Sequence, residues 1–387
     1  MPSTPLKNLL YRAALPFMAP SLRGQMTHAA AGQPLATLPD YERLLTRHHV
    51  MGATLLLSDG KRTATLHTST ANPAHAATDD TLYRVASITK MATALVTLSC
   101  IADGLFSLDS AVRPLLPETP HASALEGVTV RHLLCHTSGL ADLPALDAAL
   151  RDGRSYDDLL ADPAIRAAKP GQQLIYSNFD FGLLGCILEN ATGENLADLF
   201  RQRLFAPLGM RATLDASTLA ETDIMPITRV LPYRPGNDVT ITRLGRQPLL
   251  AADPLRHYGH TAGAMYTDAP SLAALLRFIH HRGLHEEQQL IPAALMDEMT
   301  REQSATPTRR YGLGLVVLDR PGLLPRRLLG HQGFAYGCVD GAFIEEETGR
   351  LVVFLNGGAS EARQGKLGLV NRDVLTWALT KEMPAWT

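Results

Sequence analysis

The sequence is poor in cysteine, in aromatic residues and in charge. Of its 387 residues, four are cysteines, 6% are aromatic and 19% are charged. The cysteines are far apart and form no CxxC pair, so neither a disulfide framework nor a zinc ribbon is indicated. Three of them lie in apolar runs, which is typical of buried, inert thiols. This usage fits a reducing compartment and leaves an oxidising one open.

The chain also lacks an excess of charge of one sign and a long apolar run. The chain has 36 basic and 38 acidic residues, a net charge of −2. Near-neutral charge without a basic run argues against nucleic acid as the main ligand. No uninterrupted apolar stretch reaches the roughly 18 residues that cross a bilayer. We therefore expect neither a nucleic-acid partner nor a membrane span, and the oligomeric state stays open.

Residues 1–38 contain a segment that resembles an export signal. Lys7 precedes several leucines, but Arg12 and Pro16 interrupt the apolar stretch and no small-residue cleavage site follows it. We interpret these residues as an N-terminal arm, either a short amphipathic helix or a loose segment. The expected location is the cytoplasm, with the periplasm or secretion as the alternative.

Both ends of the chain carry the patterns of an antiparallel sheet. A helical stripe over 39–49 precedes two strand-like runs, 50–58 and 61–68, joined by the strong hairpin signal Asp59-Gly60. The last third predicts strands over 311–318, 338–346 and 350–356, and a closing helix over about 363–381. Adjacent strands with short connections imply an antiparallel sheet that terminal helices cover.

The middle of the chain is different. From residue 87 to about 210 the apolar spacing is mostly helical, and proline and glycine punctuate the helices. Residues 212–260 are polar and irregular, with a turn signal at 235–238, and a helical pattern returns over 269–282. We expect an α+β fold with a sheet lobe from 39–86 and 255–387 and an inserted, mainly helical lobe from 87–254.

The sharpest local feature is Ser87-Ile88-Thr89-Lys90, at the start of a long apolar helix. Residues at i and i+3 share a helix face, so the Lys90 ammonium can lie beside the Ser87 hydroxyl. We expect Ser87 to cap this helix, where unpaired N–H groups favour negative charge. A serine there can be deprotonated and attack a carbonyl. S-x-x-K also occurs by chance, with the lysine exposed.

Two further segments carry polar groups suited to catalysis. Tyr176-Ser177-Asn178 precedes a helix; a phenol near an ammonium can act as a base, and the Asn178 amide can hold the lysine or a substrate carbonyl. Gly330-His331-Gln332-Gly333 lies between two predicted strands, where glycines let a substrate backbone approach closely. Taken alone, the first segment is equally a helix cap with a packed tyrosine, and the second a hairpin turn.

Together these segments resemble the serine β-lactamase-like family. The likeness is greatest to its branch of class C β-lactamases, esterases and D-peptidases, among the penicillin-recognising hydrolases. It covers residues 40–360 and rests on five motifs in order. They are Ser87-x-x-Lys90, VTVRHLLCHTSGL (128–140), YSN (176–178), GHTAGAMYTDAPSLAALLRF (259–278) and GHQG (330–333).

The resemblance implies a β-lactamase/transpeptidase-like fold with the active site in a cleft between the lobes. It implies that Ser87 is the acylated nucleophile, that Lys90 activates it and that Tyr176 is the general base. It makes Asn178 the polar partner of the tyrosine, and His331 and Gly333 the third motif of the site. The oxyanion hole would consist of the backbone N–H groups of Ser87 and Phe334.

The sequence departs from the lactamase pattern at the residues that bind the carboxylate of the substrate. Lactamases use the lysine of a K-T-G motif to grip a carboxylate, but His331 and Gln332 occupy those positions here. A neutral imidazole binds a carboxylate more weakly than an ammonium does. We therefore expect small esters, short D-residue peptides or amides to be better substrates than β-lactam antibiotics. Phe334 narrows the site where related sequences often have a small residue.

The candidate motifs for a metal or a cofactor are all incomplete. His132 and His136 are four residues apart, but no glutamate completes H-E-x-x-H and no third ligand is near. Gly312-Leu313-Gly314 fails the dinucleotide pattern because Val317 stands at the third glycine position. Neither a G-x-S-x-G nor a P-loop motif is present. We expect no metal and no cofactor.

The sequence is compatible with three functions. The leading hypothesis is a serine hydrolase in which Tyr176, anionic or poised by Lys90, takes the Ser87 proton. The second is a catalytically idle protein that binds penicillin or peptides on the same scaffold. The third is an acyltransferase that passes the acyl group to an amine or alcohol. In each case the partner is a small molecule or a short peptide.

Overall fold

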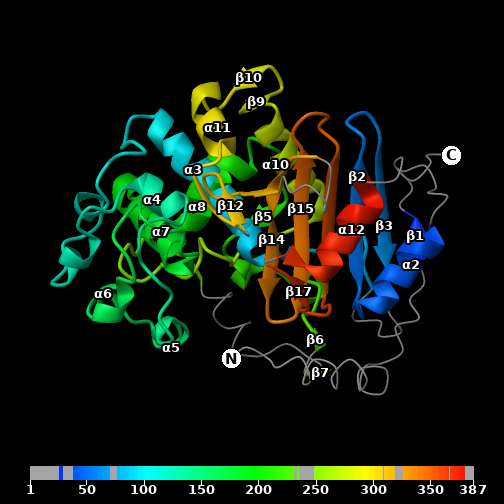
Figure 1. The fold of residues 1–387 in the computed structure, drawn as a ribbon, viewed down its shortest axis with the longest axis horizontal. Coiled ribbons are helices and arrows are strands. Elements are labelled where there is room, and N and C mark those ends of the chain that lie inside the picture. The colour runs from blue at the N-terminus through cyan, green and yellow to red at the C-terminus, as the bar shows by residue number, and fades with distance from the viewer. Residues whose placement is uncertain are drawn as a thin grey trace.

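A nine-stranded antiparallel sheet forms the centre of the computed structural model (Figure 1). The structure describes residues 26–28, 38–69, 76–230, 233–234, 248–307, 309–318, 326–365 and 367–379. From one edge to the other, the strands are β1 (Met26–His28), β3 (Thr63–Thr68), β2 (Ala53–Ser58), β16 (Leu351–Asn356), β15 (Cys338–Glu345), β14 (Leu328–Ala335), β13 (Val316–Leu318), β12 (Arg309–Tyr311) and β11 (Ser304–Thr306). The two ends of the chain thus meet where β2 pairs with β16, as expected for an antiparallel α+β fold.

The sheet separates two hydrophobic cores, as strand periodicity requires. On β2, Leu55 and Leu57 join one core while Leu56 joins the other, because successive side chains of a strand point to opposite faces. Helices α2 (Leu38–Arg47) and α12 (Leu369–Leu379) cover the first face, where the Tyr41 and Trp377 rings stack at 5.2 Å. Helix α10 (Ala269–His280) packs on the other face, against β15, β16 and β2.

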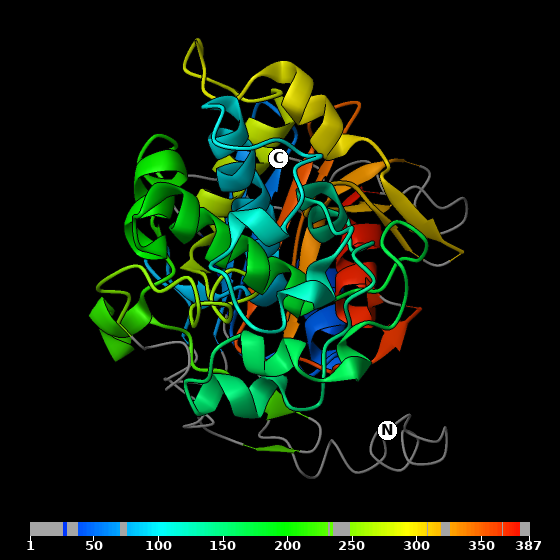
Figure 2. The ribbon, with the colours of Figure 1, turned by 90° about the vertical axis from the view of Figure 1, so that its left-hand side faces the viewer.

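Most helices lie beside the sheet, on the side of α10 (Figures 1 and 2). They are α3 (Thr89–Ala102), α4 (Val130–Leu134), α5 (Leu146–Arg151), α6 (Asp157–Leu160), α7 (Asn178–Thr192), α8 (Leu196–Phe200) and α11 (Ala293–Thr300). Helix α3 is buried around nearly its whole circumference, including Lys90 and three threonines. Within the described ranges, no helix is long and apolar enough to cross a membrane.

Short strand pairs connect these parts. Strand β8 (Tyr266–Thr267) pairs with both β4 (Tyr83–Arg84) and β5 (Ala212–Thr213). The other short strands are β6 (Arg229–Val230), β7 (Tyr233–Arg234), β9 (Leu284–His285), β10 (Gln288–Gln289), β17 (Arg363–Gln364) and β18 (Leu367–Gly368). Because β4 leads directly into the turn that carries Ser87, its pairing with β8 sets the position of that turn.

Two predicted boundaries were wrong. The run 311–318 is not one strand: β12 ends at Tyr311 and β13 begins at Val316, because the intervening turn packs against α3. A Cβ on Gly314 would lie 2.8 Å from the Lys90 carbonyl oxygen. The closing helix does not begin near 363, because β17 and β18 form a hairpin first. The turn at 235–238 and the N-terminal helix lie outside the described residues, although 26–28 of the arm form β1.

Helix α7 lies very close to the segment that precedes β8. A Cβ on Gly182 would lie 2.2 Å from the carbonyl oxygen of Tyr258. This is too short for two nonbonded atoms, so only glycine fits at this position. The Thr261 hydroxyl donates to the Phe181 carbonyl at 2.6 Å, and the Thr93 hydroxyl of α3 donates to the Thr261 carbonyl at 2.7 Å. The segment therefore joins α3 and α7, the two helices whose first turns bear the predicted site residues.

We expect Gly182→Ala to destabilise the protein by about 1–3 kcal/mol, because the new methyl group has no space against fixed backbone. Urea unfolding followed by circular dichroism measures the change. A Gly182→Ala variant as stable as the original would show that α7 can move away from the segment without cost.

Candidate active site

Ser87 lies in a single 3-10 turn, Ala86–Ile88, immediately before α3. The prediction that it caps the helix was wrong: Ile88 is the N-cap residue of α3, and no side chain caps that end. The Ser87 hydroxyl instead contacts the Lys90 ammonium at 3.2 Å and the Tyr176 hydroxyl at 2.9 Å. The side chain is therefore directed at the polar groups that could activate it.

The backbone of this turn is unusual at Ala86, whose φ is +46°. A residue with a Cβ rarely adopts this left-handed conformation, which costs on the order of 1–3 kcal/mol and is found mainly at functional sites. The Thr89 hydroxyl fixes the turn by donating to the Ala86 carbonyl at 2.6 Å, and it accepts from the Met265 N–H at 3.2 Å. The surrounding chain thus holds Ser87 in place.

Lys90 is completely buried, and its amine has three hydrogen-bond partners. Besides Ser87, it donates to Asn178 Oδ1 at 2.8 Å and to the Ala262 carbonyl at 2.7 Å. Burial lowers the pKa of Lys90 to about 7, against the opposing effect of nearby carboxyl groups. A substantial fraction of this amine is neutral near pH 7, so it can accept a proton.

The hydroxyl of Tyr176 donates its hydrogen bond to the Ser87 oxygen and not to the Lys90 amine. The Lys90 nitrogen lies over the Tyr176 ring, 5.0 Å from its centre. Burial raises the pKa of the Tyr176 phenol, which its hydrogen bond to Ser87 only partly offsets. This direction favours the protonated phenol over the phenolate, and the general-base role of Tyr176 stays a prediction. A neutral Lys90 amine can accept a proton, and a protonated Tyr176 phenol can donate one.

Asp142 organises the start of α7 and was missed from the sequence. It accepts hydrogen bonds from the backbone N–H of Asn178 at 2.7 Å and of Phe179 at 3.0 Å, and its other oxygen accepts from Asn178 Nδ2 at 2.8 Å. The amide of Asn178 is therefore turned with its oxygen toward Lys90. The negative charge of the Asp142 carboxylate also interacts favourably with the positive, N-terminal end of the α7 dipole. An aspartate 36 residues away from its partner gives no local signal.

His331 is buried beside the aromatic rings behind the site. Its ring lies 6.4 Å from that of Tyr176 and 6.5 Å from that of Tyr311, between centres. Its Nδ1 donates to the Gln332 carbonyl at 2.7 Å. Burial and the Lys90 cation lower the pKa of His331 to about 3, so the imidazole is neutral at pH 7, and Nε2 is left as a buried acceptor with no partner in the described chain.

Gly333 allows β14 to touch the turn that carries Ser87. A Cβ at this position would lie 2.3 Å from the Val85 carbonyl oxygen. The glycine thus has a packing role, which brings the neighbouring residue Phe334 to the site. Its own contact with a substrate stays a prediction.

The sheet register supports the predicted role of the Phe334 N–H. Ala335 and Cys338 close a two-residue hairpin turn with positive φ at both central residues, the geometry in which the closing pair is hydrogen bonded. Antiparallel bonding alternates, so the Phe334 N–H points away from β15. On that side β13 has already ended, its last pair with β14 being Val316 and Gly330. The N–H is therefore free of the sheet ladder.

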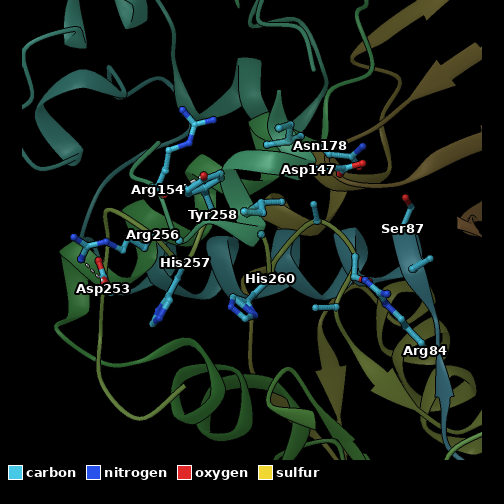
Figure 3. A pocket seen from close by; sticks show the side chains of 18 of the residues that line it. Arg84, Ser87, Asp147, Arg154, Asn178, Asp253, Arg256, His257, Tyr258 and His260 are labelled. Atoms are coloured by element: carbon cyan, nitrogen blue, oxygen red, sulfur yellow. Dashed lines mark hydrogen bonds and ion pairs between the residues drawn. The ribbon is translucent and has the colours of Figure 1, made fainter. Parts of the chain in front are cut away.

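A cavity of about 340 Å³ includes Ser87 and Asn178 in its lining. Figure 3 shows Arg84 and His260 on its wall and Arg154, Asp253 and Arg256 at its far end. Among the described residues, its lining does not include Tyr176, His331 or Phe334. The cavity thus reaches the nucleophile without including these three side chains in its lining.

Two arginines near Tyr176 were also missed. The Arg309 guanidinium lies 5.9 Å from the centre of the Tyr176 ring, and that of Arg363 lies 3.4 Å from the centre of the Phe334 ring. They come from β12 and β17, and the sequence offers no pattern that joins either to the site. They add positive charge on the side of the phenol.

The two histidines that suggested a metal site have structural partners. Nδ1 of His132 accepts from the Thr129 N–H at 3.2 Å, and Nδ1 of His136 accepts from the Ser177 N–H at 3.3 Å. Within the ranges that the structure describes, no group of three or more potential ligands could hold a metal ion.

Comparison with known proteins gives a consistent result. A family model described as Beta-lactamase matches residues 39–374. Penicillin-binding protein 4 of Amycolatopsis lactamdurans is 33% identical over 188 residues, which are 45% of this chain and 47% of that protein. Esterase EstB of Burkholderia gladioli is 29% identical over 333 residues, 77% of this chain and 82% of the esterase. The chain thus matches about half the length of the first relative and most of the second.

A solved structure shares the fold. The D-amino acid amidase from Ochrobactrum anthropi SV3, in complex with L-phenylalanine, superposes with a TM-score of 0.67 and 25% sequence identity. The alignment covers 84% of this chain and 92% of the amidase. The β-lactamase/transpeptidase-like fold expected from the motifs is thereby confirmed.

We expect Asp142→Asn to lower the activity at this site at least about tenfold, because an amide there places a donor against Asn178 Nδ2. Removing the anion also lowers the pKa of Lys90 further, since Asp142 raises it. The acid limb of the pH–rate profile should therefore move to lower pH. The exposed Asp152→Asn, at the end of α5, serves as the control. An unmoved acid limb in the Asp142→Asn variant would limit Asp142 to a structural role.

Proposed function

The chain belongs to the Beta-lactamase family, and on this basis we propose that it is a serine hydrolase that forms an acyl-enzyme on Ser87 and acts on small esters or amides. The observation that carries the proposal is the position of the Ser87 hydroxyl, within hydrogen-bond distance of both a buried amine and a phenol. Such a pair supplies the base and the acid that nucleophilic catalysis requires.

In the first step, the neutral amine of Lys90 takes the Ser87 proton while the oxygen attacks the substrate carbonyl. The backbone N–H groups of Ser87 and Phe334 stabilise the oxyanion. Tyr176 then gives its proton to the leaving alcohol or amine and recovers one from the Lys90 ammonium. The products of this step are the acyl-enzyme and the free leaving group.

In the second step, a water molecule attacks the ester carbonyl of the acyl-enzyme. The same groups act in reverse: a base takes a proton from water, and Ser87 leaves as an alkoxide that is reprotonated. Asn178, held by Asp142, keeps the Lys90 amine within reach of both oxygens.

Esters and amides fit the site better than β-lactam antibiotics do. The position of the lysine that grips the lactam carboxylate is occupied by His331, which burial keeps neutral. The relatives include an esterase and, by structure, a D-amino acid amidase. We therefore propose short-chain esters and D-residue amides as the substrate class.

We expect a fluorophosphonate probe to add one adduct to the protein, and Ser87→Ala to abolish both the adduct and the hydrolysis of 4-nitrophenyl acetate. Intact-mass spectrometry measures the first and absorbance the second. Tyr176→Phe should lower the turnover at least about 100-fold, because it removes the proton donor. An equal adduct on the Ser87→Ala variant would contradict the assignment. Adduct formation without turnover of any substrate would favour a binding protein, and transfer to an added alcohol would favour an acyltransferase.

The rate should depend on the protonation of Lys90. Because the pKa of this amine is lowered to about 7, its basic form is scarce at pH 5 and predominant at pH 8. We expect kcat/KM for a neutral ester to rise about tenfold per pH unit below pH 7 and to level off above it. Initial rates between pH 5 and 9 test this. A flat profile across pH 7 would exclude Lys90 as the base.

Nitrocefin should be a poor substrate. A neutral imidazole forgoes a charge-assisted hydrogen bond to the lactam carboxylate, worth about 1.5–3 kcal/mol or roughly 10- to 150-fold in rate. We expect kcat/KM for nitrocefin to be lower than that for 4-nitrophenyl butyrate by at least this factor. Comparable values for the two would show that another group binds the carboxylate.

A further inference from the structure

The cavity beside Ser87 contains an arginine without an acidic partner in the described chain. Arg84 lies three residues before Ser87, so their Cα atoms are at most about 10 Å apart. Its Nε donates to the Gly263 carbonyl at 3.2 Å, and its guanidinium lies 5.3 Å from the centre of the Tyr336 ring. Nη1 is buried and has no hydrogen-bond partner among the described residues. A buried donor on a charged group is costly unless something accepts from it.

A second unsatisfied group lines the same cavity. His260 is 6% exposed, and its Nδ1 is buried with no partner among the residues that the structure describes. Burial, with His257 and Arg84 nearby, lowers the pKa of His260 to about 3, so the ring is neutral and one of its nitrogens carries a proton. Arg84 and His260 both belong to the wall shown in Figure 3. The cavity therefore combines a cation with a neutral imidazole, whose Nδ1 is a donor in the tautomer that carries its proton there.

The position of Tyr176 decides which part of a substrate enters the cavity. In the proposed reaction, the phenol protonates the leaving group, which must therefore lie on the side of Tyr176. The cavity does not include Tyr176 in its lining, but it does include Ser87. The acyl part, which stays attached to Ser87, is thus directed into the cavity.

The other charges of the cavity do not compete with Arg84 at this position. Asp253 pairs with Arg256 at 3.1 Å, and His257 contacts the buried Glu189 at 2.7 Å. Asp147 and Arg154 are exposed and opposite in charge, so solvent and salt screen them. The half-buried guanidinium of Arg84 is the charge that an acyl chain meets near the nucleophile.

We propose that this cavity binds a carboxylate on the acyl part of the substrate, with Arg84 as its cationic partner and His260 as a second donor. The favoured substrates are half-esters and half-amides of short dicarboxylic acids. This inference rests on the proposed hydrolase function and narrows its substrate class.

The test compares matched ethyl esters at pH 8, with ethanol release as the measurement. The anionic series is monoethyl succinate, glutarate and adipate; the neutral series carries a terminal amide in place of each carboxylate; ethyl 4-(trimethylammonio)butanoate is the cationic ester. We expect kcat/KM for the best anionic ester to exceed that of its amide counterpart about 10- to 100-fold. Arg84→Gln should remove this preference, Arg84→Lys should keep part of it, and Arg363→Gln, a matched loss of charge near Tyr176, should keep it in full.

Several results would overturn the inference: equal rates for anionic and neutral esters, faster cleavage of the cationic ester, a preference that survives in the Arg84→Gln variant, or one that is lost in the Arg363→Gln variant. Binding of glutarate and of glutaramide to Ser87→Ala, measured by calorimetry, needs neither turnover nor a folded Arg84 variant. Glutarate should bind at least about tenfold more tightly, and equal binding contradicts the proposal. If the wild type cleaves no ester while glutarate binds selectively, the hydrolase proposal fails and the carboxylate site stands.

Discussion

The burial of the Lys90 amine is the constraint on which the rest of the site depends. An ammonium out of water loses its hydration, and here three oxygen atoms of the described chain, from Ser87, Asn178 and Ala262, accept its hydrogen bonds. Two consequences follow from this single fact. The pKa falls toward 7, which makes the amine a usable base. The three oxygens are also held at fixed positions, because each is bound to the same buried nitrogen.

Each of those oxygens belongs to a different part of the chain, and close backbone contacts hold the parts together. Asn178 opens α7, and Asp142 fixes its amide. Ala262 belongs to the segment before β8, which packs closely against α7 because residue 182 is a glycine. Gly333 similarly lets β14 touch the turn that carries the nucleophile. A side chain at either glycine would separate elements that the reaction requires to be in contact, so these positions act on the chemistry through packing.

Much of the fold and part of the site followed from local patterns. The alternation of β2, the Asp59-Gly60 turn and the helical spacing after residue 87 are properties of neighbouring residues, and they correctly indicated an α+β fold. The position of Lys90 beside Ser87 followed from the i, i+3 geometry of a helical turn. The capping role of Ser87 did not follow, because its hydroxyl is drawn to Tyr176 and Lys90 instead of the helix end. The raised pKa of the Tyr176 phenol did not follow either, because burial was not visible in the sequence.

The sequence by itself determined which chemical groups are present and which of them are neighbours within one turn or one strand. It also determined the fold class and, through the order of five motifs, the family. Only the tertiary structure decided the direction in which burial shifts the pKa values of Lys90 and Tyr176, the attachment of Asp142 to Asn178, and the unsatisfied Arg84 in the cavity. The physical reason is that pKa values and hydrogen bonds depend on burial and on atoms brought together from distant positions, such as the 88 residues that separate Lys90 from Asn178.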